Sequence, residues 1–207
     1  MTDRVSRIVL ASGNKHKLVE IKSLLADLPL TVATPHDFPR WPIVEEDGST
    51  FKENALKKAM NGFEHTGLPC IADDSGLEVD ALGGRPGVHS SRYAGESASD
   101  AENNARLLRE LANIPSEKRT ARFCCVIAFV FPGRENKEML FSAGTCEGRI
   151  GYALQGTNGF GYDPLFIPTG YERTYAQLSA EEKNMISHRA KALSDFKEKL
   201  RVWLHTI

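Results

Sequence analysis

The chain has 207 residues, of which 41% are hydrophobic and 26% charged, a composition typical of a globular protein. Its formal net charge of −1 argues against tight sequence-independent nucleic-acid binding, which needs a basic surface, but leaves single nucleotides possible as ligands. The apolar run 8–11 near the N-terminus is far too short for a signal peptide or a membrane span, so we expect no membrane partner.

Apolar and capping patterns predict the order of the elements. The expected strands are short apolar runs bounded by turn residues; they are 8–11, 30–33, 70–73, 77–81 and 122–131, with 138–147 pairing back on 122–131 as a hairpin. The expected helices carry apolar residues at helical spacing, and several open on a Ser/Thr…Glu capping pair; they lie around 18–25, 50–67, 99–111 and 192–203, with a further cap at Ser179. The stretches 34–49, 83–98 and 148–161 are expected as loops.

This order predicts an α/β fold with a mixed sheet, because a hairpin cannot belong to a purely parallel sheet. No repeat, low-complexity tract or linker interrupts the chain, and we therefore expect one domain. The four cysteines form no CxxC or Cys/His pattern, so a zinc site is not expected. Cys124 and Cys125 adjoin inside an apolar run, as buried reduced thiols of a cytoplasmic protein do.

Asp73 and Asp74 are the most informative pair, since they follow the apolar run 70–72 and precede Ser75-Gly76. Two neighbouring carboxylates raise each other's pKa unless a cation compensates them. Mg²⁺ is the natural cation for hard oxygen ligands, and it usually carries substrate phosphates on its remaining sites. The alternative interpretation is an ordinary turn, for which Asp-Ser-Gly is favourable chemistry.

Two further groups have acceptable interpretations both with and without a ligand. The turn 12–17 leads from a strand into a helix, where backbone N–H groups and the helix dipole can hold a phosphate, yet it can be a simple connection. The acidic run 45–47 is usually solvated surface, and it becomes a metal site only if it lies near Asp73 and Asp74. Lys57 and Lys58 can both belong to a solvated helix face, or one of them can turn inward to neutralise phosphate charge or hold these carboxylates, and the helical period does not choose between these cases.

The C-terminal half has an aromatic and cationic group of its own. The stretch 156–164 is dense in glycine and aromatic residues, and Phe160 is a candidate to stack on a base, or is simply a buried ring in a packed turn. His188 and Arg189 lie between two helical segments. A lone histidine is more often structural, whereas an arginine at a helix start suits a planar base or a phosphate.

Taken together and in this order, five blocks resemble the inosine/xanthosine triphosphate pyrophosphatase family: SGNKHK (12–17), EEDGSTFKENALKKA (45–59), IADDSGLEVDALGGRPGVHSSRYAGE (71–96), GTNGFGYDPLFIP (156–168) and EEKNMISHRAKAL (181–193). The resemblance implies an elongated mixed β-sheet flanked by helices, with two lobes and a central active-site cleft within one domain over residues 1–207. It implies Mg²⁺-dependent hydrolysis of ITP, dITP and XTP to the monophosphate and pyrophosphate, which cleanses the nucleotide pool, by a cytoplasmic homodimer.

The resemblance also implies roles for single residues. The phosphate-binding turn falls on Ser12, Gly13, Asn14, Lys15, His16 and Lys17. The metal-binding glutamate falls on Glu45 or Glu46, with Glu45 preferred, and Asp74 is implied as second metal ligand and general base, with Asp73 and Lys58 beside it. The remaining substrate contacts fall on Ser75, Phe160, Gly161, Tyr162, Asp163, Lys183, His188 and Arg189.

Two departures from the family pattern stand out. Ser12 replaces a common threonine but keeps the hydroxyl, and Asn158 replaces a common glycine, which affects loop geometry rather than chemistry. Two rival functions remain: a pyrophosphatase of modified pyrimidine triphosphates on a similar fold, and a non-catalytic nucleotide-binding module. The second rival has no need for the carboxylates of 45–46 and 73–74.

Overall fold

The computed structural model describes residues 7–206, without the side chains of His16, Leu24 and Thr206. It contains one six-stranded sheet in the order β2-β1-β3-β4-β5-β6. The strands are β1 (Arg7–Leu10), β2 (Thr31–Ala33), β3 (Cys70–Val79), β4 (Thr120–Pro132), β5 (Lys137–Ile150) and β6 (Phe166–Pro168). The α-helices are α1 (Lys15–Leu25), α2 (Phe51–Thr66), α3 (Asp100–Glu110), α4 (Ala180–Ile186) and α5 (His188–Thr206). Short 3₁₀ helices cover Pro35–Asp37, Asp80–Leu82, Gly87–Arg92, Ser116–Lys118 and Tyr175–Gln177.

The sheet is mixed, as the sequence predicted. Strand β1 pairs in parallel with β2 and β3, whereas β5 pairs antiparallel with β6. Strands β4 and β5 are neighbours in the sheet and are joined by a four-residue connection, 133–136, which confirms the predicted hairpin. The α/β fold class is thereby confirmed.

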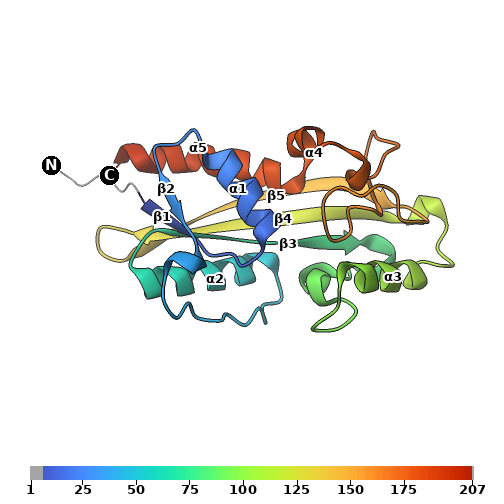
Figure 1. Ribbon diagram of the computed structural model, residues 1–207, viewed down its shortest axis with the longest axis horizontal. Coiled ribbons are helices and arrows are strands. Elements are labelled where there is room, and N and C mark those ends of the chain that lie inside the picture. Colours follow the sequence, from blue (N-terminus) through green and yellow to red (C-terminus); the bar gives the residue numbers. More distant parts are fainter. Residues whose placement is uncertain (1–6, 207) are drawn as a thin grey trace. The chain divides into compact units, whose positions relative to one another are not determined.

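The chain divides into two compact units. Unit 1 is Met1–Asp74, Val126–Ala143 and Lys191–Ile207, and unit 2 is Ser75–Cys125 and Gly144–Ala190. Within unit 1, helices α1 and α5 lie on one side of the strands and α2 on the other (Figure 1). Small residues form the contact between α2 and the strands, so the helix can approach the sheet closely; they include Ala55, Ala59, Cys70, Ala72 and Ala128.

The core of unit 2 is built from larger side chains. Leu107 and Leu111, which lie on α3 and at its C-terminal end, pack with the strand residues Leu77 and Val79. Aromatic rings make up much of the rest of this core; the buried rings are Tyr93, Phe123, Tyr162, Phe166 and Tyr175. The apolar spacing that predicted α3 marks its buried face only in part, since Leu111 is buried and Leu108 packs at the edge of this core, but Ala105 is exposed.

Capping explains where several helices begin and end. Thr50 and Glu53 form the predicted capping box of α2, and Gly67 ends that helix in the left-handed conformation, with φ 68°. Ser99 caps α3 and Ser179 caps α4 in the same way, each through a glutamate three residues later. These predicted helix starts are confirmed.

Strand β3 corrects one prediction. The sequence suggested that a strand ends at Asp73 and that a separate strand begins near Leu77, but β3 runs without a break from Cys70 to Val79. The prediction was wrong because it treated two buried carboxylates as a reason to leave the sheet. Lysines from α1 and α2 compensate both charges, so the strand continues through them.

All four cysteines are free thiols, and Cys70, Cys125 and Cys146 are buried. No described helix has the length and apolar character needed to cross a bilayer.

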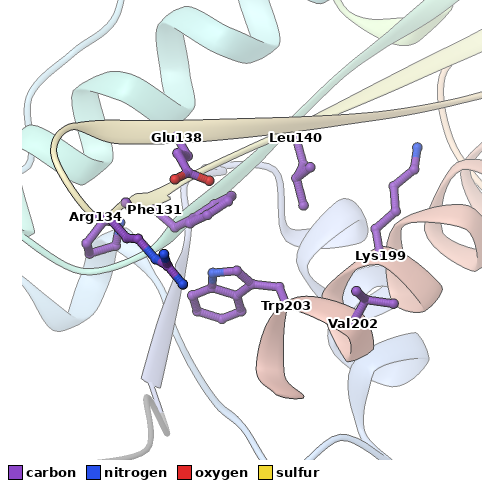
Figure 2. Close-up of a pocket in the computed structure, with 9 residues that line it drawn as sticks. Phe131, Arg134, Glu138, Leu140, Lys199, Val202 and Trp203 are labelled. Carbon is purple, nitrogen blue, oxygen red and sulfur yellow. The ribbon is translucent and has the colours of Figure 1, made fainter. Parts of the chain in front are cut away.

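A cavity of about 590 Å³ in unit 1 lies between the β4–β5 connection and α5, with Phe131 and Trp203 among the residues that line it (Figure 2). None of the predicted site residues lines this pocket.

Gly62 in the middle of α2 gives a stability prediction. A Cβ at this position would lie 2.4 Å from Cys70 Sγ and 3.1 Å from Trp41 Cη2. Alanine is the better helix former by about 1 kcal/mol, but overpacking a dense contact costs about 1–3 kcal/mol. We therefore expect Gly62→Ala to lower the free energy of unfolding, as measured by urea denaturation. The same change should lower it less in a protein in which Cys70 is also replaced by alanine. A stabilised single variant would contradict this packing.

Candidate active site

The two aspartates of β3 face opposite sides of the strand, as successive strand residues do. Asp73 contacts Lys17 of α1, with Lys17 Nζ 2.9 Å from Asp73 Oδ2. Asp74 contacts α2, which lies on the other side of the strands of unit 1 (Figure 1). The pair therefore forms two separate ion-paired groups and not one shared carboxylate site.

Lys58 joins the acidic loop to the strand. Its Nζ lies 3.2 Å from Glu46 Oε2 and 3.3 Å from Asp74 Oδ1. The neighbouring Lys57 is more exposed and pairs with Asp47. The open choice between the two lysines is thus settled: Lys58 is the one that turns inward.

Burial and neighbouring charges act in opposite directions on the pKa of Asp74 and of Lys58. Burial raises the pKa of the Asp74 carboxyl above its usual value, although Lys58 and Lys17 oppose the rise. Burial by itself would lower the pKa of Lys58, but Asp74, Asp73 and Glu46 outweigh it, and the pKa is raised. Lys58 is therefore a fixed positive charge among these carboxylates.

The structure places Glu46 in this group, since the carboxylate with a contact to Lys58 is that of Glu46. Glu45 is exposed. The resemblance gave Glu45 as the preferred metal ligand and Glu46 as the alternative. The geometry supports Glu46 better than Glu45.

The turn 12–17 has a structural role that the sequence left open. Asn14 Oδ1 accepts from the backbone N–H of Lys17 at 3.2 Å, and the N–H of Asn14 donates to Ser12 Oγ at 3.3 Å, so Asn14 caps the start of α1. At Gly13 no heavy atom outside the adjoining residues lies within 4 Å of where a Cβ would stand, which leaves the backbone accessible. Lys15 is exposed, and the side chain of His16 lies outside the described residues.

A metal ion fits this region in one particular way. Among residues 7–206, no group of three or more His, Cys, Asp or Glu side chains is placed to hold a metal. The carboxylates of Glu46 and Asp74 nevertheless both contact Lys58, and their oxygens are hard ligands of the kind that Mg²⁺ binds. Mg²⁺ is usually bound by one or two carboxylates and completed by water and substrate phosphates, so this donor set fits an ion that arrives with a phosphate chain.

Unit 2 gathers the aromatic and cationic residues. Asp163 Oδ2 accepts from Lys183 Nζ at 2.6 Å and from the backbone N–H of Phe160 at 3.0 Å. Lys183 Nζ lies 5.1 Å from the centre of the half-buried Phe160 ring, and Arg189 Cζ lies 5.7 Å from it. Asp163 therefore holds both the loop backbone and one of the two cations near the ring.

Helix α3 fixes the loop beside Phe160. The N–H of Gly161 donates to Asp100 Oδ2 at 2.7 Å, and Asn104 Nδ2 donates to the carbonyl of Gly161 at 2.8 Å. Tyr162 is buried, and its hydroxyl donates to the carbonyl of Ser90 at 2.8 Å. Gly161 and Tyr162 thus hold the loop in place, and Phe160 is the half-buried ring that it presents.

Arg189 and His188 differ in their surroundings. Arg189 is buried, and its Nη2 donates to Ser75 Oγ at 3.0 Å, which places Ser75 and Arg189 together. His188 is buried and stacks on Phe123, with the ring centres 4.7 Å apart and the planes 10° from parallel. This stacking is what a structural histidine shows, and a role for His188 in substrate binding stays a prediction.

Sequence reasoning missed Asn54, Asp100 and Asn104. Asn54 donates to Asp74, and the other two hold Gly161. For Asn54 a signal existed: it lies four residues before Lys58 in the same helix, so both side chains lie on one face. Asp100 and Asn104 contact Gly161, which lies 57 or more positions further along the chain, and no local sequence pattern predicts such a contact.

The fold and these two groups define the class: an α/β protein with carboxylates and lysines gathered in unit 1 and an aromatic ring with two cations in unit 2. The chain belongs to the Ham1 family, whose model matches residues 8–199.

The relatives agree with this placement. A protein of Geobacter sulfurreducens named dITP/XTP pyrophosphatase is 53% identical over 95% of this chain and 97% of its own length. A protein of Desulforamulus reducens with the same name is 50% identical over 96% and 98%. Among solved structures, a HAM1 protein from Coxiella burnetii has a TM-score of 0.86 at 45% identity, covering 94% of this chain and 98% of that one. The family predicted from the sequence is confirmed.

Proposed function

We propose that the protein is a Mg²⁺-dependent nucleoside-triphosphate pyrophosphatase that hydrolyses dITP, XTP and ITP to the monophosphate and pyrophosphate. The relatives named dITP/XTP pyrophosphatase support the substrate class. The observation that carries the proposal is the group in unit 1 where Lys58 contacts both Glu46 and Asp74. A partly buried lysine between two carboxylates supplies a positive charge for the phosphates and negative charges for the metal ion, and binding a metal triphosphate requires both.

In this proposal Glu46 and Asp74 hold the metal ion. When bound, Mg²⁺ neutralises phosphate charge and orients the triphosphate for in-line attack. The exposed turn at Gly13 offers backbone N–H groups to the phosphates at the start of α1.

The residues of unit 1 divide the remaining work. Asp74 orients the attacking water and accepts its proton as the water oxygen bonds to phosphorus and the phosphoanhydride bond breaks. Burial raises the pKa of Asp74, and a higher pKa makes it a better base. Lys17 and Lys58 stabilise the negative charge that builds on the departing pyrophosphate.

The residues of unit 2 read the base. Phe160 offers a ring face for stacking, and Arg189 or a backbone N–H donates to the 6-keto oxygen of hypoxanthine or xanthine. Adenine presents an amino group there and would leave the donor unpaired, at a cost of about 1–3 kcal/mol. Guanine carries the same keto oxygen, and its rejection must act through the 2-amino group.

Product analysis tests the proposal. The purified protein is incubated with Mg²⁺ and a panel of ITP, dITP, XTP, ATP, GTP and modified pyrimidine triphosphates, and the products are separated. We expect monophosphate and pyrophosphate from ITP, dITP and XTP, and little from ATP and GTP. Orthophosphate with a diphosphate would contradict the bond assignment, preference for a pyrimidine would favour the first rival, and binding without turnover the second.

Phe160 gives a prediction on affinity. Stacking of a base on an aromatic side chain is worth about 1–3 kcal/mol, so Phe160→Ala should raise KM for ITP about tenfold and change kcat less. Steady-state kinetics with pyrophosphate detection measure both constants. Tyr152→Ala is the matched control, because Tyr152 is an exposed aromatic residue of the same unit at 61% exposure. An unchanged KM in Phe160→Ala would mean that the ring does not stack on the base.

Three further parts of the proposal rest on the family resemblance: assembly as a homodimer, a cytoplasmic location, and one catalytic domain over residues 1–207 with an active-site cleft. Size-exclusion chromatography with light scattering tests the first directly. We expect a mass of two chains at micromolar concentration, and a single-chain mass would contradict it.

A further inference from the structure

Asn54 is the most deeply buried polar side chain near the proposed catalytic group. It lies in the first turns of α2 and has 0% exposure. A buried side-chain amide is costly unless its donor and its acceptor are both paired. The two hydrogen bonds of the Asn54 amide therefore indicate the structural role of this residue.

Both ends of the amide are paired, and with functionally distinct partners. Asn54 Nδ2 donates to Asp74 Oδ2 at 3.2 Å, and Asn54 Oδ1 accepts from the backbone N–H of Gly48 at 2.8 Å. Gly48 directly follows the acidic run 45–47 and lies two residues after Glu46. One side chain thus connects the strand carboxylate to the loop that carries the proposed metal-binding glutamate.

Gly48 is itself fitted to this contact. A Cβ there would lie 2.6 Å from Asn54 Oδ1 and 2.9 Å from Glu53 Cβ. The φ angle of Gly48 is not positive, so glycine serves here to give space and not to allow an unusual backbone conformation. The loop backbone can approach Asn54 only because the position has no side chain.

Asn54 and Lys58 are one helical turn apart and meet Asp74 from the same face of α2. Lys58 contacts Asp74 Oδ1 and Asn54 contacts Asp74 Oδ2, so each carboxylate oxygen has its own partner. Lys58 also contacts Glu46, and Asn54 also contacts Gly48. The helix therefore holds the carboxylate and the loop at two points each.

We propose that Asn54 is a positioning residue that fixes the rotation of the Asp74 carboxylate and the place of the loop 46–48 relative to it. This inference rests on the proposed function of Asp74. Asn54 does not touch the substrate in this proposal. It acts through Asp74 and Gly48, and its loss should lower turnover without weakening substrate binding to the same degree.

The first test compares Asn54→Leu with Asn61→Leu, the same change in the same helix two turns later. We expect kcat for ITP to fall about 10- to 100-fold in Asn54→Leu with KM within about threefold, since small misplacement of a catalytic group is costly. Asn61→Leu should keep both constants near those of the unmodified protein. An Asn54→Leu variant with normal kcat overturns the proposal.

The second test does not depend on activity. Hydrogen exchange at the Gly48 amide should be about tenfold faster in Asn54→Leu than in the unmodified protein, because its acceptor is gone. Asn61→Leu should leave that amide unchanged. Equal exchange in all three proteins means that Asn54 does not hold the loop.

The third test uses Gly48→Ala, a change in a loop that keeps Asn54 and also covers the case in which Asn54→Leu folds poorly. The added Cβ should displace the amide and lower kcat, and the double variant should lose no more than the worse single one, because both changes break one network. Additive losses overturn the proposal. Asp74→Asn is measured in parallel. If the unmodified protein releases no pyrophosphate from ITP, the proposed function fails; if Asp74→Asn stays active, the role of Asp74 fails and the positioning role with it. An inactive Asp74→Asn with a fully active Asn54→Leu removes only the positioning role.

Discussion

Asp74→Asn should lower kcat for ITP about 10²- to 10⁴-fold in the presence of Mg²⁺ while the protein stays folded. The side-chain amide of the introduced asparagine has nearly the shape of the Asp74 carboxylate, so it can keep part of the contacts with Asn54 and Lys58. It cannot accept a proton from water, and it is a poor ligand for Mg²⁺. Steady-state kinetics and a thermal unfolding scan measure the two effects separately.

Asp27→Asn is the matched control for this variant. Asp27 is a carboxylate of the same unit, it is exposed, and it pairs with Lys197 and Arg201. We expect kcat and KM of the control to match those of the unmodified protein. If Asp74→Asn turned over ITP at a near-normal rate, Asp74 would be neither the base nor a required metal ligand.

Lys58→Met should lower kcat and destabilise the protein by about 3–5 kcal/mol, because it removes the cation that contacts the buried Asp74 carboxylate. A divalent ion on the same carboxylates would replace the missing charge. We therefore expect Mg²⁺ to raise the melting temperature of Lys58→Met more than that of the unmodified protein, since an ion that binds only the folded state stabilises it. Thermal unfolding with and without Mg²⁺ measures this difference.

Lys57→Met separates the effect from a general loss of charge. Lys57 adjoins Lys58 in α2 and pairs with Asp47 in a more exposed position, its side chain being 43% exposed against 13% for Lys58. An exposed ion pair contributes about 0–1 kcal/mol, so this variant should be nearly as stable as the unmodified protein. Equal behaviour of the two lysine variants would show that Lys58 has no special place among the carboxylates.

The fold was predictable where one signal dominated. Capping pairs such as Thr50–Glu53 fixed the helix starts, and the turn at Pro132-Gly133 between two apolar runs fixed the hairpin. The course of β3 was not predictable from its own residues. Two adjacent aspartates favour leaving a strand, and only Lys17 and Lys58, which lie on separate helices, make their burial acceptable.

The candidate site was predictable by residue type more than by contact. Helical spacing alone offered Lys57 and Lys58 equally, and only the family resemblance named Lys58. In the structure Lys58 contacts Glu46, whereas Lys57 pairs with Asp47. Asn54 shares a helix face with Lys58, which was a usable signal, but no local pattern shows that its amide is buried between the strand and the loop. Such roles depend on long-range packing, which local periodicity does not encode.

The most direct measurement is a crystal structure of the protein with Mn²⁺ and a non-hydrolysable α,β-imido analogue of ITP, with the metal located by anomalous scattering. Mn²⁺ takes the place of Mg²⁺, because carboxylate and phosphate oxygens suit both ions. We expect the ion bonded to carboxylate oxygens of Glu46 and Asp74 and to oxygens of the triphosphate. An ion held by neither carboxylate, with the triphosphate bound elsewhere, would contradict the proposed site.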